Sequence, residues 1–376
     1  MRRRLMRHWR AAVAATALMT IATACGSDDD GGGNDDPAAL AEAAEQRLAD
    51  NPALAELVEA ARQEGALNLN WGLHGQGALE DLTDAFQEAY GLDLDVTLTP
   101  DQNMPGNVAE VIEENNSGSR SSTDALLASS DLTFSVGPQG ADALQAIDFT
   151  EVAPWTEDLV NSDGTSVTLL DQIPGFTYNT TLIPENEVPR SAAEVLELDQ
   201  PVASTPYAAQ FNILGDENIM GEEGIREYLG AFEPAGLFGC GELSRVASGE
   251  FAALWLSCGS NLAAVVAEQG APLETAILED AAVVSPWYAS VPKNAAHPAA
   301  ATLWVTWLTT PEAQELLYEH ELADNTRVEG SRTAEEIAAH EADGVEFTEN
   351  SYEYVADHPE LFSREFKSEL IELLTD

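Results

Sequence analysis

The first half of the chain alternates between strand-like and helix-like spacing of its apolar residues. Residues 67–71 (LNLNW) alternate between apolar and polar side chains, as a half-buried strand does, and residues 79–90 place apolar side chains three and four positions apart, as a helix does. A strand at 94–98, a helix at 108–114 and a strand at 125–128 follow the same rules. This order predicts a mainly parallel sheet covered by helices on both faces.

A second set of short apolar runs predicts a second α/β lobe and a return of the chain to the first. Trp304 and Trp307 lie in an apolar helical stretch and are expected in the core. The next helix opens with Thr310 as N-cap and Pro311 at the first helical position. The expected strands are 168–170, 176–178, 201–204, 273–277 and 281–285, and the expected helices are one starting at Ala208 and those at 224–232, 298–308, 311–320, 333–340 and 363–374.

The first 24 residues predict an export signal. Five arginines in residues 1–10 precede an uncharged, mostly apolar run at 11–24, which is too short for an ordinary membrane span. The sequence ATAC at 22–25 resembles the lipobox of bacterial lipoproteins, in which the cysteine is lipidated and becomes the new N-terminus. The resemblance predicts cleavage before Cys25 and a lipid anchor on the outer face of the cell membrane. The alternative is an ordinary signal peptide cut after Ala24, which leaves a free cysteine.

A linker and N-terminal helices are expected between this signal and the first strand. Residues 25–37 are rich in Asp and Gly and carry no large apolar side chain, so they cannot offset the entropy of ordering and predict a flexible acidic linker. Residues 38–65 have helical spacing and end at Gly65, which favours N-terminal helices.

The charge balance excludes some partners. The chain has 16 Lys and Arg against 66 Asp and Glu, a formal net charge of −50. Such a surface repels the phosphates of nucleic acids and anionic lipid headgroups, so neither partner is expected. The only expected attachment to the membrane is the lipid on Cys25.

Apart from the predicted lipidation site Cys25, the chain has two cysteines, Cys240 and Cys258. In an exported chain, such an even pair predicts a disulfide, worth on the order of 3 kcal/mol in the chain-entropy model. A zinc site is not expected, because the neighbouring glycines supply no further ligands.

Four segments together resemble the extracellular solute-binding proteins of bacterial ABC importers, the subgroup with iron, phosphonate, thiamine and polyamine binders. They are residues 57–97, 175–196 (GFTYNTTLIPENEVPRSAAEVL), 246–256 (VASGEFAALWL) and 291–317 (VPKNAAHPAAATLWVTWLTTPEAQELL). The last is the strongest, because its two helices open with His-Pro and with a small residue, Pro, Glu and, two residues on, Gln. The order of these segments along one chain is more specific than any one of them.

The resemblance implies a two-lobed periplasmic-binding fold of the α/β class, with a mixed, mainly parallel sheet in each lobe and two hinge crossings. Lobe 1 is then expected at 66–174 and 266–376, and lobe 2 at 175–265. The implied partners are a small-molecule solute, a membrane permease and its ATPase. The protein is expected to be a monomer without enzymatic activity. Residues 323–376 depart from the family pattern and receive no expected function.

Ligands of open α/β sheets bind beyond the carboxyl ends of strands, where loops and helix N-termini present free N–H groups. This rule points to segments 73–77, 129–130 and 205–208, and matching family positions add 258–261 and 287–288. The candidate ligand-binding residues are His74, Gly75, Gln76, Ser129, Ser130, Tyr178, Tyr207, Ser257, Ser260, Asn261, Trp287 and Tyr288.

Each of these candidates has a structural alternative. His74 either binds a ligand or is a solvated residue in a Gly-rich turn. Ser129 and Ser130 either bind solute or cap the segment that follows. Tyr178 and Tyr207 either stack on a solute or fill a gap between the lobes.

The ligand class follows from what is missing around residues 256–261. Iron-binding members of the family carry adjacent tyrosines after a segment like 251–255, but here 256–261 is LSCGSN. A small polar organic solute or an oxyanion is therefore expected, with no metal and no cofactor. A ferric-iron site with other ligands stays open as an alternative.

An exported hydrolase is the competing class of function. The chain has no Gly-x-Ser-x-Gly elbow, no His-Glu-x-x-His and no Gly-Lys-Ser/Thr loop. Among 66 acidic residues, a glycosidase-like acidic pair remains open.

Overall fold

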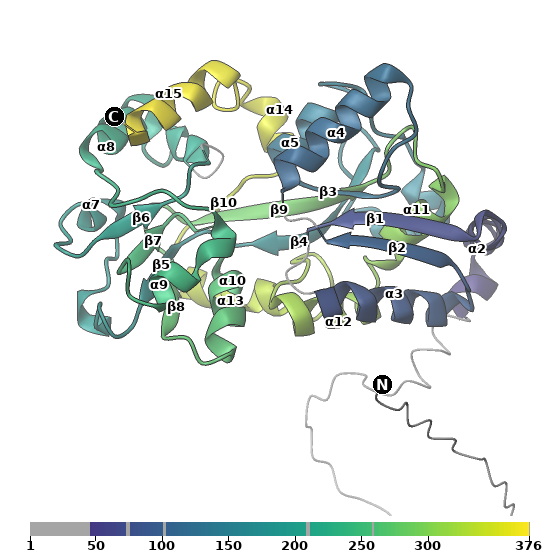
Figure 1. The fold of residues 1–376 in the computed structure, drawn as a ribbon, viewed down its shortest axis with the longest axis horizontal. Coiled ribbons are helices and arrows are strands. Elements are labelled where there is room, and N and C mark those ends of the chain that lie inside the picture. The colour runs from purple at the N-terminus through teal and green to yellow at the C-terminus, as the bar shows by residue number, and fades with distance from the viewer. Residues whose placement is uncertain (1–45, 73–75, 101–102, 208–210, 258, 376) are drawn as a thin grey trace, which may run out of the picture.

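The computed structural model describes residues 46–72, 76–100, 103–207, 211–257 and 259–375. Two α/β lobes lie side by side and are joined in the middle by long strands (Figure 1). The predicted signal peptide, the predicted lipidation site Cys25 and the predicted linker of 25–37 lie outside the described residues.

The first lobe contains the predicted strand-helix alternation. β1 (Ala66–Trp71) pairs in parallel with β2 (Asp95–Pro100), and a parallel bridge from Leu69 to Ala125 links β1 to β3 (Leu126–Ser129). β3 and β4 (Ser166–Gln172) both pair antiparallel with β9 (Val283–Ser290). The sheet is therefore parallel where helices connect its strands and antiparallel where the chain comes back from the second lobe.

Local sequence explains where the connecting helices begin and end. α3 (Gln76–Tyr90) follows β1, and α4 (Met104–Ser117) follows β2. The Asn103 side chain caps α4 by accepting from the N–H of Gly106 at 3.3 Å, and Gly118 ends the helix with a φ of 68°, a left-handed conformation that glycine adopts without strain. α5 (Ser130–Val136) begins directly after β3.

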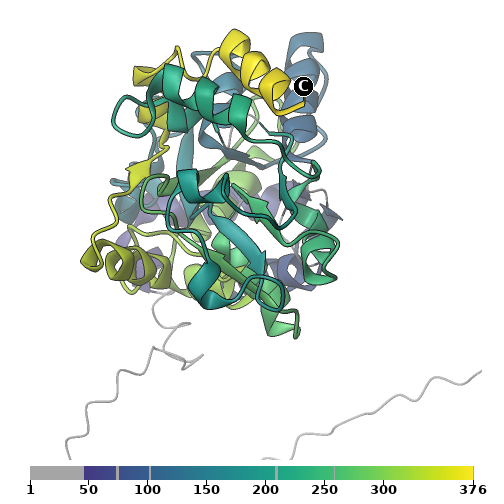
Figure 2. The same cartoon turned by 90° about the vertical axis from the view of Figure 1, so that its left-hand side faces the viewer.

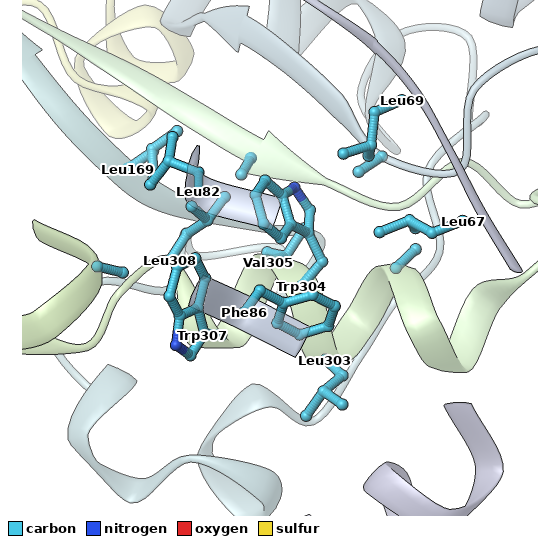
Figure 3. Packing of buried hydrophobic residues seen from close by; sticks show 14 of the residues in the cluster. Leu67, Leu69, Leu82, Phe86, Leu169, Leu303, Trp304, Val305, Trp307 and Leu308 are labelled. Carbon is cyan, nitrogen blue, oxygen red and sulfur yellow. The ribbon is translucent and has the colours of Figure 1, made fainter. Parts of the chain in front are cut away.

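Aromatic side chains form the centre of the first core (Figure 3). Trp304 of α11 (Pro298–Trp307) packs edge-on against Phe86, with ring centroids 5.3 Å apart, and stacks on Trp307 at 5.6 Å. The prediction that both tryptophans belong to the core is confirmed, since they are at most 1% exposed. α2 (Pro52–Glu64) and α12 (Pro311–Glu321) also contribute to this cluster. The Thr310 cap is confirmed by its side chain, which accepts from the N–H of Ala313.

One buried carboxylate fastens the first lobe internally. Asp124 is fully buried and accepts hydrogen bonds from the N–H groups of Asn68, Ala296 and His297. The His297 ring nitrogen Nδ1 lies 2.8 Å from the same carboxylate. This single side chain therefore joins β1 to the turn that opens α11.

The second lobe has a four-stranded sheet in the order β6-β7-β5-β8. α8 (Gly221–Ala231) packs on one face and α10 (Ser260–Glu268) on the other. The strands are β5 (Phe176–Asn179), β6 (Val202–Ser204), β7 (Ala253–Trp255) and β8 (Leu273–Ala276), and the short helices of the chain are α6 (Phe149–Val152), η1 (Pro154–Thr156), η2 (Glu185–Glu187), α7 (Ala192–Val195), η4 (Asn212–Gly215), η5 (Cys240–Glu242) and α9 (Ser244–Ala247).

Two expectations about this lobe differ from the structure. The helix expected from Ala208 is, in its described part, the 3-10 turn η4. The expected boundary at 265 cuts the second sheet, because β8 is hydrogen-bonded to β5 and α10 packs on β8. The chain therefore returns to the first lobe only between β8 and β9, after residue 276.

The C-terminal segment crosses back over both lobes. It contains α13 (Arg332–Ala342), β10 (Thr348–Glu349), α14 (Tyr352–Asp357) and α15 (Arg364–Thr375). β10 pairs in parallel with the start of β9, α14 packs on α5 of the first lobe, and α15 packs on α8 of the second (Figures 1 and 2). The two helices predicted at 333–340 and 363–374 are confirmed, with slightly different ends.

Candidate functional site

Ser129 and Ser130, at the first lobe's strand ends, are engaged within the protein. Ser129 stands at the N-cap position of α5, but its side chain makes no capping bond and instead donates to Asp131 Oδ1 at 2.8 Å. Ser130 is buried, and its hydroxyl donates to the carbonyl oxygens of Asn350 and, at 3.3 Å, Pro286. The C-terminal segment thus occupies the side of α5 where a solute contact was expected.

Buried polar atoms without a partner among the described residues occur in both lobes, and four of them lie at strand ends near the crossing or at the start of α10 (Ser260–Glu268). Gln172 Oε1 lies at the end of the crossing strand β4, and Thr205 Oγ1 and Ser257 Oγ follow the ends of β6 and β7. β6 and β7 are parallel neighbours with Ser204 opposite Trp255, so the two hydroxyl-bearing residues leave the sheet at the same edge. Buried polar atoms are nearly always hydrogen-bonded, so an unpartnered group of them indicates a place for a ligand.

Residues 259–261, at the start of α10, lie beside Gln172 of this group. A Cβ on Gly259 would clash with Asn261 Oδ1 and lie 3.1 Å from Gln172 Cδ, so a larger residue there would displace these side chains. Asn261 donates from Nδ2 to the carbonyl oxygen of Glu321 at 2.9 Å, while its Oδ1 has no partner among the described residues. Ser260 donates to Glu336 of α13, and burial raises the pKa of that carboxyl.

Backbone strain marks the same place. Leu256, directly before Ser257, has a φ of 49°. A residue with a Cβ pays on the order of 1 kcal/mol or more in this left-handed region, and such residues are concentrated at ligand-binding sites. The four unpartnered atoms, on Gln172, Thr205, Ser257 and Asn261, are hereafter called the crossing cluster.

Trp287 and Tyr288 point to opposite faces of β9, as neighbours on a strand must. Tyr288 is 2% exposed, its hydroxyl accepts from the N–H of Tyr352 at 2.9 Å, and burial raises its pKa. Trp287 is half-buried beside the first-lobe core and lies opposite Ser129 in the strand pairing. Trp287 therefore lies on the face of β9 opposite to the one that contacts Tyr352.

Tyr178 and Tyr207 make other contacts within the second lobe. Tyr178 lines a pocket of about 850 Å³ on the second lobe, beside β8, and its hydroxyl donates to Glu274 at 2.6 Å. Tyr207 is 39% exposed, and its hydroxyl lies 2.9 Å from the position that a Cβ on Gly239 would take.

Several predicted site residues cannot be placed. His74, Gly75 and Cys258 lie outside the described residues, and for Gln76 only the backbone, at the start of α3, is described. The disulfide between Cys240 and Cys258 therefore stays a prediction.

Further electrostatic features surround the crossing. Asp171, next to Gln172, is fully buried, and its pKa is raised by burial although Thr326 donates to it from both its N–H and its hydroxyl.

Among the described residues, no group of three or more His, Cys, Asp or Glu side chains has the arrangement of a metal site, and no helix is long and apolar enough to cross a membrane.

Sequence reasoning missed Gln172, because a glutamine inside a strand carries no motif. Only the folded structure shows that its side-chain oxygen has no partner among the described residues and that its side chain lies beside Gly259. The ion pair between Asp131 and Lys367 was missed because the two residues are 236 positions apart in the sequence.

Two α/β lobes, strand crossings between them and unpartnered polar atoms at strand ends define a ligand-binding protein of the two-lobed periplasmic-binding fold. The model of the bacterial extracellular solute-binding protein family matches residues 72–315, and the chain belongs to this family. A search of curated proteins finds no match.

Solved structures share the fold at low sequence identity. A substrate-binding protein of an ABC transporter from Agrobacterium tumefaciens is 18% identical with a TM-score of 0.64, covering 82% of this chain and 94% of its own. Iron-bound HitA from Pseudomonas aeruginosa is 15% identical with a TM-score of 0.57, covering 71% and 88%. AfuA from Actinobacillus pleuropneumoniae, with fructose-6-phosphate bound, is 17% identical with a TM-score of 0.61, covering 82% and 97%.

Proposed function

We propose that this protein is the solute-binding component of an ABC importer, which captures a small polar organic solute or an oxyanion between its lobes and delivers it to a membrane permease. The family membership supports the general role. The observation that carries the ligand class is the crossing cluster, four buried polar atoms that lack a partner among the described residues.

The chemistry of the crossing cluster suits a ligand that makes hydrogen bonds. The amide oxygens of Gln172 and Asn261 accept, and the hydroxyls of Thr205 and Ser257 both donate and accept. A solute with hydroxyl or amine groups can donate to the two amide oxygens, and a hydroxyl or oxyanion group can accept from the two hydroxyls. Each satisfied group removes a desolvation cost of about 1–3 kcal/mol. Trp287, half-buried at the crossing, supplies an apolar wall.

The proposal includes export and anchoring. A lipid on Cys25 followed by a flexible linker would hold the binding domain near the permease while leaving it free to rotate. A disulfide between Cys240 and Cys258 would brace the loop that carries Ser257, because Cys258 is its neighbour in the sequence.

A thermal-shift screen tests this function. The protein is heated with ferric ion, phosphonates, thiamine, polyamines, amino acids and sugars, since a ligand that binds only the folded state raises the melting temperature by mass action. The expected result is one saturable hit that is lost in Gln172→Ala and in Ser257→Ala. Tyr178→Phe is the matched control, because Tyr178 lies in the separate pocket beside β8 and its loss should leave the shift unchanged.

Two outcomes contradict the proposal. A hit that survives both crossing-cluster variants would place the solute elsewhere. A screen without any hit, together with hydrolysis of one of the compounds, would favour an enzyme.

A further inference from the structure

The C-terminal segment 350–375 is attached firmly to the first lobe at its beginning. Tyr352 is 1% exposed, and its hydroxyl donates to Asp163 Oδ2 at 2.6 Å. Its ring lies 5.5 Å from that of Phe134 in α5. Glu353 accepts from the N–H of Ser162 at 2.8 Å. These contacts hold α14 on the first lobe.

The same segment is attached to the second lobe from Tyr354 onward. The Tyr354 hydroxyl donates to Asp216, and Asn212 donates from Nδ2 to the carbonyl oxygen of Leu361 at 3.2 Å. Phe366 and Leu370 are at most 5% exposed in the apolar core of this lobe. α15 therefore belongs to the packed core of the second lobe, although the chain reaches it from the first.

One contact of α15 points back across to the first lobe. Lys367 Nζ lies 2.6 Å from Asp131 Oδ2 in the first turn of α5, and Asp131 Oδ1 accepts from Ser129. Lys367 is one of only two lysines in 376 residues, and the other is Lys293. In a chain with 66 acidic residues, the Lys367 ammonium is thus placed at a contact between the lobes.

The ion pair has the properties of a contact that can open. The Lys367 side chain is 28% exposed, so water and salt reach it from that side, although the Asp131 side chain is 7% exposed. The anchors at Tyr352 and Phe366 are buried. A shallow surface pocket of about 550 Å³ adjoins it, lined among the described residues by Phe362, Arg364, Lys367, Ser368, Ile371 and Glu372. The lysine therefore has room to leave Asp131 without a steric clash.

We propose that residues 350–375 form a third connection between the lobes and that the Lys367–Asp131 ion pair is its releasable contact, which positions the lobes at the observed spacing. This role goes beyond solute capture, because it acts on the ligand-free protein. A result on this ion pair therefore stands whether or not the thermal-shift screen finds a solute.

The test measures the distance between the lobes in the ligand-free protein. Spin labels are carried by unnatural amino acids at Glu113 of α4 and Glu223 of α8, both exposed, so the three cysteines stay untouched. Double electron–electron resonance then compares wild type with Lys367→Met and Lys367→Arg. Arg226→Met is the matched control. Arg226 of α8 pairs at 2.9 Å with Glu369, which lies on α15 like Lys367, but this ion pair lies entirely within the second lobe.

In Lys367→Met, we expect the distribution of distances between the two labels to gain a population at longer distance. The ratio of the longer-distance to the shorter-distance population should change roughly two- to fivefold, the size of effect that a partly exposed ion pair allows. Lys367→Arg should restore the wild-type distribution, and Arg226→Met should not change it. A Lys367→Met distribution equal to that of wild type, or an Arg226→Met distribution equal to that of Lys367→Met, would overturn the proposal.

A second measurement covers the case in which Lys367→Met fails to fold. Wild-type protein in 1 M NaCl, where the screening length is about 3 Å, should gain the same longer-distance population. Asp131→Asn should gain it at low salt and lose its response to salt. A wild-type distribution of label distances that does not respond to salt would count against a releasable Lys367–Asp131 contact.

Discussion

Replacing Asp124 with Ala tests how strongly one buried carboxylate holds the first lobe together. Its oxygens accept from three backbone N–H groups, those of Asn68 at 2.8 Å, Ala296 at 2.6 Å and His297 at 2.9 Å. The side chain is 0% exposed, so bulk water cannot replace these bonds without opening the structure.

The expected loss follows from the three orphaned donors. Each buried N–H left without a partner costs about 1–3 kcal/mol, and partial relaxation around the shorter alanine brings the total for Asp124→Ala to about 3–5 kcal/mol. Urea unfolding, followed by the fluorescence of Trp71, Trp304 and Trp307 in the same lobe, measures this loss as a lower midpoint with an unchanged slope.

Asp142→Ala is the control for the removal of a carboxylate. Asp142 pairs with Lys293 at 2.6 Å, but the two side chains are 65% and 38% exposed. An ion pair so exposed contributes less than about 1 kcal/mol. If Asp124→Ala costs no more than Asp142→Ala, the reasoning that burial decides the value of a carboxylate here is refuted.

Three further predictions concern the core, the crossing and the site. Trp304→Ala should lower the free energy of unfolding by about 3–5 kcal/mol, because a fully buried indole leaves a cavity, and a loss below about 1 kcal/mol in urea would contradict the packing described. Burial raises the pKa of Asp171, so above about pH 4 the folded protein keeps a proton that the unfolded chain has released, and stability falls as the pH rises. Asp171→Asn should therefore flatten the decline of the urea midpoint between pH 4 and 7, and parallel curves for the two proteins would contradict this. Gly259→Ala places a Cβ 3.1 Å from Gln172 Cδ and should weaken binding of any solute found by the screen roughly tenfold or more in calorimetry, whereas unchanged affinity would remove Gly259 from the site.

Much of the fold could be predicted because its signals are local. The alternation at 67–71 and the helical spacing at 79–90 depend on residues a few positions apart, and both elements form as expected. Thr310 and the two helix tryptophans are likewise explained by their own segments. The boundary at 265 was misplaced because no local pattern shows that β8 pairs with β5, a strand almost a hundred residues earlier.

The candidate site was predictable only as a region. The rule about strand ends led to segment 205–208, where Thr205 does carry an unpartnered atom, and equally to Ser130, whose hydroxyl is taken by Asn350. The family resemblance led to Ser257 and Asn261, which also carry unpartnered atoms. Tyr288 was likewise selected, but its hydroxyl is taken by Tyr352. Nothing near Ser130 or Tyr288 in the sequence announces these partners.

Residue type and spacing along the chain determine where helices and strands form, and the family resemblance of four segments adds the expectation of a two-lobed solute-binding fold. Tertiary structure decides which polar side chains are already satisfied and which are free for a ligand. The reason is physical: a hydrogen bond or ion pair needs two groups within about 3 Å, whatever their separation in sequence. Ser130 and Asn350 are 220 positions apart, and Asp131 and Lys367 are 236 apart. Only folding brings the C-terminal segment to the lobe contact that these pairs define.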